Sequence, residues 1–222
     1  MNFNDFVNFT ANHCSYNGIR FLVSDKASIP YAGTDSMCTG YFDDGTSTGQ
    51  PTLAIAKGSP SAFGVLVHEY CHSTQFLDLS KVWVDIQPNS VEKELFGEYA
   101  DDLFFSWIDG NIGPETHIFH IDRIMRQFNA LVAVELDCEK RTVALIEALG
   151  IEIDPVEYTQ KANSYVYMYQ YFLKHRCFYR PGFEPYNIQA VWSQMPQDFD
   201  TLDYFAPITE KYERLFKEHC YA

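Results

Sequence analysis

The residues of this chain that could do chemistry are concentrated in the run His68-Glu69-Tyr70-Cys71-His72. Two histidines four residues apart lie one turn apart on the same face of a helix, so both imidazoles can bind one metal ion. The glutamate after the first histidine is displaced by about 100° around the helix axis and can reach a water beside the metal. The spacing therefore predicts a zinc site with His68 and His72 as ligands and Glu69 as the general base.

A catalytic zinc ion also needs a third protein ligand and one open coordination position. Asp78 lies six residues after His72, about 240° around a continuing helix, and is therefore rejected as a ligand. Two pairs of carboxylates with a four-residue spacing remain, Glu98 with Asp102 and Glu135 with Glu139. In each pair one carboxylate can bind the metal while the other accepts a hydrogen bond from the second ring nitrogen of a histidine.

We prefer Glu135 as the third ligand because its helix is expected to face the core. The apolar residues that precede it are Phe128, Leu131, Val132 and Val134. Glu139 would then orient His68 or His72, and it also remains an alternative ligand. Glu98 stays a second alternative, although its acid-rich surroundings are more typical of a solvated helix face.

The elements that must hold these residues indicate an α+β fold, mainly helical with a small N-terminal antiparallel or mixed sheet. Strands are expected at 18–23, 39–42 and 52–57, and helices at 4–16, 62–77, 89–107, 114–149 and 155–175. We expect a single domain over residues 1–222. It would consist of a sheet lobe (1–60), a helical lobe with the metal site (61–176) and an aromatic, proline-rich C-terminal tail (177–222) that wraps the surface.

Composition and charge exclude several classes of function. The 222 residues carry a formal net charge of −14, which argues against binding nucleic acid or an anionic membrane surface. We find no signal peptide and no apolar run of transmembrane length, so we expect a cytoplasmic protein. The six cysteines form no CxxC pair and are expected to be reduced. We interpret Cys71 and Cys138 as small buried hydrophobic residues.

The two histidines with the downstream carboxylate pair resemble the gluzincin class of zinc metallopeptidases. That class has HExxH on one helix and Glu-xxx-Asp on the next. This chain has Glu139 where the class has Asp, whereas Glu98-xxx-Asp102 matches the class spacing letter for letter. The resemblance implies a zincin-like fold.

A closer likeness is to uncharacterised metallopeptidase-like proteins encoded by tailed bacteriophages. It extends over about the last two-thirds of the chain and is carried by HEYCHSTQF (68–76), ELDCEKRTV (135–143), YTQKANSYVY (158–167) and PYN…VWSQMP (185–196). With the zincin-like fold, it implies that an edge strand of the small sheet, such as 52–57, lies above the zinc and lines the substrate. The host cytoplasm would be the compartment of a viral protein.

The function expected from the sequence is that of a zinc-dependent hydrolase, a peptidase acting on a peptide or protein substrate. Glu69 would take a proton from water and pass it to the leaving amine. Candidate donors to the oxyanion are Tyr158, Tyr165 and His175. The alternative is a non-catalytic, zinc-stabilised interaction protein, and a metal-free helical protein with a chance motif is a third hypothesis. The sequence indicates no oligomeric state.

Overall fold

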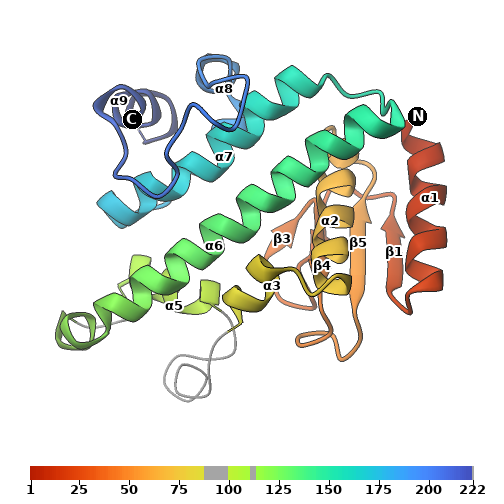
Figure 1. The fold of residues 1–222 in the computed structure, drawn as a ribbon, viewed down its shortest axis with the longest axis horizontal. Coiled ribbons are helices and arrows are strands. Elements are labelled where there is room, and N and C mark those ends of the chain that lie inside the picture. The colour runs from red at the N-terminus through yellow and green to blue at the C-terminus, as the bar shows by residue number, and fades with distance from the viewer. Residues whose placement is uncertain (88–99, 111–113, 222) are drawn as a thin grey trace. The chain divides into compact units, whose positions relative to one another are not determined.

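The computed structural model describes residues 1–87, 100–110 and 114–221, and it has an α+β fold with mainly helices and one small mixed sheet (Figure 1). The chain forms two compact units, described separately below. Unit 1 comprises Met1–Ser80 and Cys138–Pro155, and unit 2 comprises Lys81–Asp137 and Val156–Ala222. These units cut across the expected lobes, because the helix that carries the two histidines packs on the sheet.

The sheet of unit 1 has the strand order β1-β5-β4, with β1 (Arg20–Ser24) parallel and β4 (Gly40–Asp43) antiparallel to β5 (Thr52–Ala56). A separate two-stranded pairing joins β2 (Ile29–Pro30) to β3 (Met37–Cys38). The expected mixed sheet is confirmed. The expectation that 52–57 forms an edge strand is wrong, since β5 lies between two neighbours and every one of its residues is buried. A strand with apolar residues on both faces is more stable in the middle of a sheet than at an edge exposed to water.

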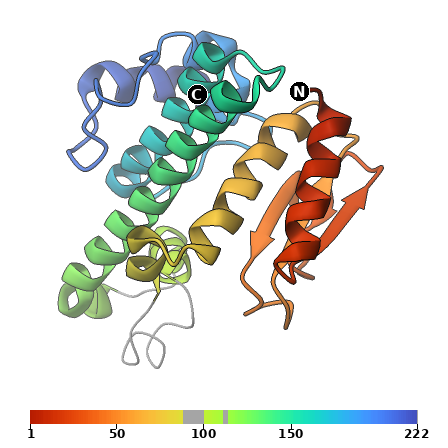
Figure 2. The ribbon, with the colours of Figure 1, turned by 45° about the vertical axis from the view of Figure 1, so that its right-hand side comes forward.

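Two helices pack side by side against this sheet, as Figure 2 shows. Helix α1 (Phe3–Tyr16) is capped by Asn2, whose side chain accepts a hydrogen bond from the Asp5 amide. Helix α2 (Ala62–Leu77) meets α1 through aromatic side chains, including the edge-to-face pair Phe6–Tyr70 at 5.6 Å between ring centroids. The expected helices at 4–16 and 62–77 are both confirmed.

The end of α6 (Pro114–Leu149) also belongs to unit 1, from Cys138 onward. Arg141 of this stretch pairs with Asp78 at 3.2 Å and donates to the hydroxyl of Thr74, also on α2. The amino group of Met1 donates to the carbonyl of Gly150, which ties the chain start to the end of α6. The last three turns of α6 are therefore anchored to α2, the helix of the predicted zinc site.

Unit 2 is helical. It contains α3 (Lys81–Ile86), α5 (Ala100–Ile108), the first part of α6, α7 (Pro155–His175), η1 (Pro185–Asn187), α8 (Gln189–Trp192), α9 (Glu210–Phe216) and the π-helical turn η2 (Lys217–Tyr221). The helices expected at 114–149 and 155–175 are confirmed. Of the helical region expected at 89–107, residues 100–107 are helical and 89–99 lie outside the described residues.

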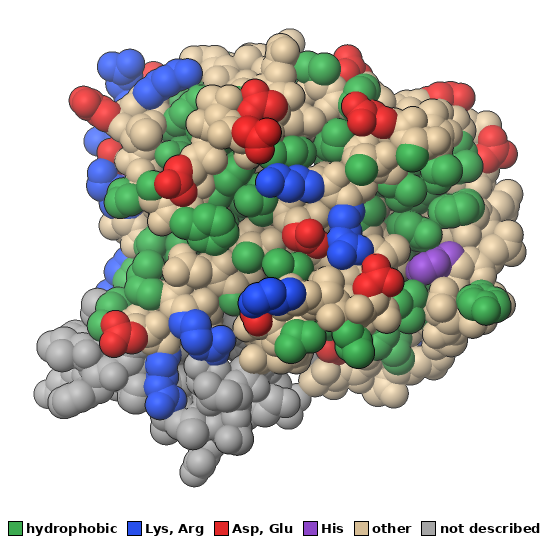
Figure 3. Space-filling view, viewed as in Figure 1, with side chains coloured by type: hydrophobic (Ala, Val, Ile, Leu, Met, Phe, Trp, Pro, Cys, Tyr) green, Lys and Arg blue, Asp and Glu red, His purple; other side chains and the backbone are tan. Residues whose placement is uncertain are grey.

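The C-terminal segment packs into unit 2 more deeply than a surface tail would. Val191 and Met195 are buried, and α7 holds this segment by side-chain amides: Gln160 donates to the carbonyl of Met195 at 2.9 Å, and Asn163 to that of Pro196 at 2.8 Å. Charged side chains of both signs are exposed on the face in Figure 3. No helix in the described ranges is long and apolar enough to cross a membrane.

Candidate metal centre

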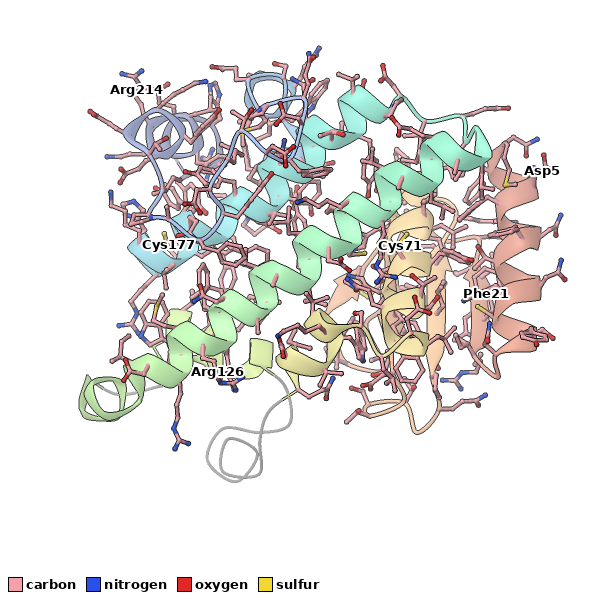
Figure 4. The ribbon with its side chains drawn as sticks, in the orientation of Figure 1. Asp5, Phe21, Cys71, Arg126, Cys177 and Arg214 are labelled. Carbon is pink, nitrogen blue, oxygen red and sulfur yellow. The ribbon has the colours of Figure 1, made fainter. Side chains whose placement is uncertain are left out.

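Helix α2 presents the two histidines of the predicted site one turn apart. The centroids of the His68 and His72 rings are 4.6 Å apart and the ring planes are nearly perpendicular, at 88°. Leu66 and Val67, which precede them, are fully buried, and His72 itself is only 9% exposed. Figure 4 marks this stretch of α2 by Cys71. A buried imidazole needs polar partners, so the contacts of each ring nitrogen decide what the pair can do.

Gln75 supplies the partner of His72. Its side-chain oxygen lies 2.8 Å from His72 Nδ1, and the Gln75 side chain is completely buried. An amide oxygen only accepts hydrogen bonds, so Nδ1 carries the proton and Nε2 presents its lone pair to a metal. Gln75 was not among the site residues predicted from the sequence. The signal that could have found Gln75 is its spacing, three residues after His72 on one helix face.

Glu139 supplies a partner for His68. Its Oε1 atom lies 3.2 Å from His68 Nδ1, and Glu139 is 4% exposed. The buried carboxylate restrains the ring and places a negative charge beside it. This contact is the one expected if Glu139 orients a histidine, and its role at a metal stays a prediction.

Cys138, the neighbour of Glu139, brings a sulfur atom to the same ring. Its Sγ atom lies 3.6 Å from His68 Nδ1, and the thiol donates to the His68 carbonyl at 3.2 Å. One ligand atom each from His68, His72 and Cys138 lies within 4.8 Å of the other two. The interpretation of Cys138 as a buried residue agrees with its zero exposure, but its place beside the histidines was missed. The missed signal is that Cys138 directly precedes Glu139 on the helix that carries the candidate carboxylates.

Electrostatics around His68 favour a cation. Burial alone lowers the pKa of its ring, but the neighbouring Cys138 and Glu139 outweigh that effect and hold the pKa well above its ordinary value. A divalent metal ion satisfies the same negative surroundings and displaces the proton. Burial, and then the charge of Cys138, raise the pKa of the Cys71 thiol to about 12, so that Cys71 stays protonated at neutral pH. The donor set of imidazole, carboxylate and sulfur fits zinc.

Glu69 follows His68 on the neighbouring face of α2 and is half-buried. Burial, and then the negative charge of Glu69, raise the pKa of the Cys38 thiol to about 11. Glu69 therefore lies within electrostatic reach of Cys38 on strand β3.

Of the remaining candidates, Glu135, Tyr158, Tyr165 and His175 belong to unit 2. Glu135 lies one turn before Glu139 on α6, and burial, followed by the charge of Glu135, raises the pKa of Tyr165 well above its ordinary value. The Tyr165 hydroxyl lies 3.1 Å from that of Tyr169. His175 pairs with Glu213 at 2.7 Å near α9, which gives its ring a structural partner.

Tyr158 is half-buried on α7. Asp78, rejected from the sequence, ends α2 and pairs with Arg141 in the structure. Glu98 lies outside the described residues.

Comparison of the chain with protein-family models, with curated proteins and with solved structures gives no match. Any function must therefore be argued from the geometry of the cluster itself.

Proposed function

We propose that this chain is a zinc-dependent hydrolase with a zincin-like fold that cleaves peptide bonds in a peptide or protein substrate. His68 and His72 would hold the zinc, and Glu69 would act as the general base. The observation that carries the proposal is the buried pair of imidazoles, one helical turn apart, with the polar side chains of Gln75 and Glu139 against their Nδ1 atoms. A third ligand would come from α6, for which the sequence predicts Glu135.

Zinc, when bound by these residues, would lower the pKa of water toward about 7 and polarise a carbonyl group. Glu69, half-buried on the neighbouring face of α2, would accept the proton of the attacking water. The same carboxyl group would then protonate the leaving amine, so that the base is regenerated in each cycle. The donor to the oxyanion stays a prediction, with Tyr158, Tyr165 and His175 as the candidates.

The proposal is tested by the Glu69→Gln variant of the full chain, loaded with zinc. We expect cleavage of a proteome-derived peptide library, read as new N-termini by mass spectrometry, to fall by about 100- to 10,000-fold. Zinc content should stay unchanged, because Glu69 is not a ligand. Glu147→Gln, an exposed substitution near the end of α6, is the matched control and should cleave like the wild type.

Equal cleavage by Glu69→Gln and wild type would defeat the role of Glu69. A wild-type protein that binds zinc but cleaves no member of the library would favour a non-catalytic, zinc-stabilised interaction protein instead. Absence of zinc from the wild-type protein would support the third hypothesis, a metal-free helical protein with a chance motif.

A further inference from the structure

The stretch of α6 in unit 1 carries a thiol as well as a carboxylate to the histidine pair. Cys138 is completely buried, and its Sγ atom lies 3.6 Å from Nδ1 of His68. A ligand atom of His72 lies within 4.8 Å of both. This group lies wholly within unit 1, in contrast to the predicted third ligand Glu135, which belongs to unit 2.

The separation of sulfur and nitrogen is that of two ligands on one zinc ion. With Zn–N of about 2.0–2.1 Å, Zn–S of about 2.3 Å and a tetrahedral angle, the two ligand atoms lie about 3.6 Å apart. The observed distance between Cys138 Sγ and His68 Nδ1 is 3.6 Å. This separation allows one ion to lie at ordinary bonding distances from both atoms.

Gln75 determines which ring nitrogen of His72 is able to bind the ion. Because the Gln75 amide oxygen accepts the Nδ1 proton of His72, the lone pair of that ring is on Nε2. In His68 the ring nitrogen that would bind the ion is Nδ1, because Nδ1 is the atom that faces the thiol and the carboxylate of α6. The two histidines are therefore prepared to bind through different nitrogens.

We propose that the Cys138 thiolate is the third protein ligand of this zinc site, with His68 bound through Nδ1 and His72 through Nε2. The inference rests on the metal-binding part of the proposed function. On metal binding the S–H bond breaks and its proton leaves to solvent, while a sulfur–zinc bond replaces the hydrogen bond from the thiol to the His68 carbonyl. Glu139, at 3.2 Å from Nδ1, adds a negative charge beside the ion.

A thiolate ligand has a consequence for metal choice. Two imidazoles and one thiolate favour zinc, cobalt and cadmium over magnesium, calcium and manganese, which prefer oxygen ligands. Three protein ligands still leave one position open, as a hydrolytic site needs.

X-ray absorption at the zinc edge of the wild-type full chain tests the ligand without any variant. We expect one sulfur at about 2.3 Å together with nitrogen or oxygen at about 2.0–2.1 Å. A shell of nitrogen and oxygen alone would overturn the thiolate ligand while leaving the zinc hydrolase proposal intact. Failure of the protein to bind zinc would defeat both, so the two failures are distinguishable.

Cobalt substitution then identifies the sulfur. The cobalt-loaded wild type should show a thiolate-to-cobalt charge-transfer band that disappears in Cys138→Ser, a variant first checked for folding by circular dichroism. Cys71→Ser removes a second buried thiol of unit 1 and is the matched control, so the band should persist in it. The band should also persist in Glu135→Gln. Its survival in Cys138→Ser, or its loss in Cys71→Ser, would contradict the assignment.

Discussion

The two units place buried polar side chains in different kinds of contact. In unit 2, amides on α7 donate to backbone carbonyls of the following segment: Asn163 reaches Pro196 and Asp198, both at 2.8 Å, and Gln160 reaches Met195 at 2.9 Å. In unit 1, the buried polar side chains of the cluster contact one another, and each contact involves a histidine or its neighbours.

A buried polar group can hold a segment of the chain in place, or it can prepare a side chain to bind a metal ion. An amide bonded to a carbonyl satisfies the backbone of a segment without regular structure and fixes that segment in place. The His72 imidazole, bonded to an amide oxygen, has a fixed tautomer, and a fixed tautomer matters for binding a metal. The comparison therefore predicts that variants of the histidine cluster in unit 1 affect metal binding, whereas variants of the α7 amides in unit 2 affect folding.

The largest effect is expected from His72→Ala. Zinc affinity should fall by about 3–4 kcal/mol, or about 100- to 1,000-fold, because roughly 10–16 kcal/mol of binding is shared among about four ligands. Competition with a chromophoric chelator measures the change. His175→Ala in unit 2 is the control and should keep the wild-type affinity; an equal loss there would break the comparison.

A variant that removes a side-chain amide from unit 2 should lower stability and leave zinc affinity unchanged. Asn163→Ala loses two hydrogen bonds to the backbone carbonyls of Pro196 and Asp198, and it also removes the side-chain oxygen that accepts from the Tyr204 hydroxyl. We expect the free energy of unfolding in urea to fall by about 2–3 kcal/mol, with zinc affinity unchanged. A lower zinc affinity with normal stability would show that this network serves the metal site rather than the fold.

A smaller loss of zinc affinity is expected from Gln75→Ala. Without the amide oxygen, the proton of His72 is no longer held on Nδ1, and affinity should drop by about 10- to 100-fold. Gln75→Glu restores an acceptor and should recover much of the affinity. Wild-type affinity in Gln75→Ala, measured by the same chelator competition, would mean that the hydrogen bond does not prepare the ring.

The smallest effect concerns the loop after β4, away from the histidines. The Asp43 carboxylate accepts from the hydroxyl of Thr48 and from the amides of Ser47, Thr48 and Gly45, and these hydrogen bonds outweigh burial and lower its pKa. The contribution of Asp43 to the free energy of unfolding is therefore fully present above the unfolded pKa of about 3.9. It is lost as the pH falls through the lower pKa of the folded state. Asp43→Asn should cost about 1 kcal/mol at pH 7, less at pH 2, and leave zinc binding intact. An equal cost at both pH values would contradict this account.

Local patterns in the sequence predict much of the fold. The bounds of α2, α6 and α7 agree with helical periodicity, because apolar spacing and capping residues act within a few turns. The place of β5 at the centre of the sheet could not be obtained in this way. Strand order depends on which distant segments pair, and a strand such as Thr52–Ala56 reads the same in either position until its neighbours are known.

In the candidate site, too, some residues could be predicted from local spacing and others depend on tertiary packing. His68, Glu69 and His72 follow from spacing on a single helix. The contact of Glu139 with His68 was one of several possibilities, and that of Cys138 was not anticipated, because both depend on how the end of α6 packs against α2. Local spacing identifies which residues can do chemistry, whereas tertiary packing decides which of them meet.

Metal content tests the central claim most directly. The purified full chain, equilibrated with zinc and dialysed, should retain about one zinc ion per chain, and the His68→Ala/His72→Ala double variant, checked to be folded, should retain none. Wild-type protein without stoichiometric zinc, or a double variant with the same zinc content as the wild type, would contradict the claim that this histidine pair is a metal site.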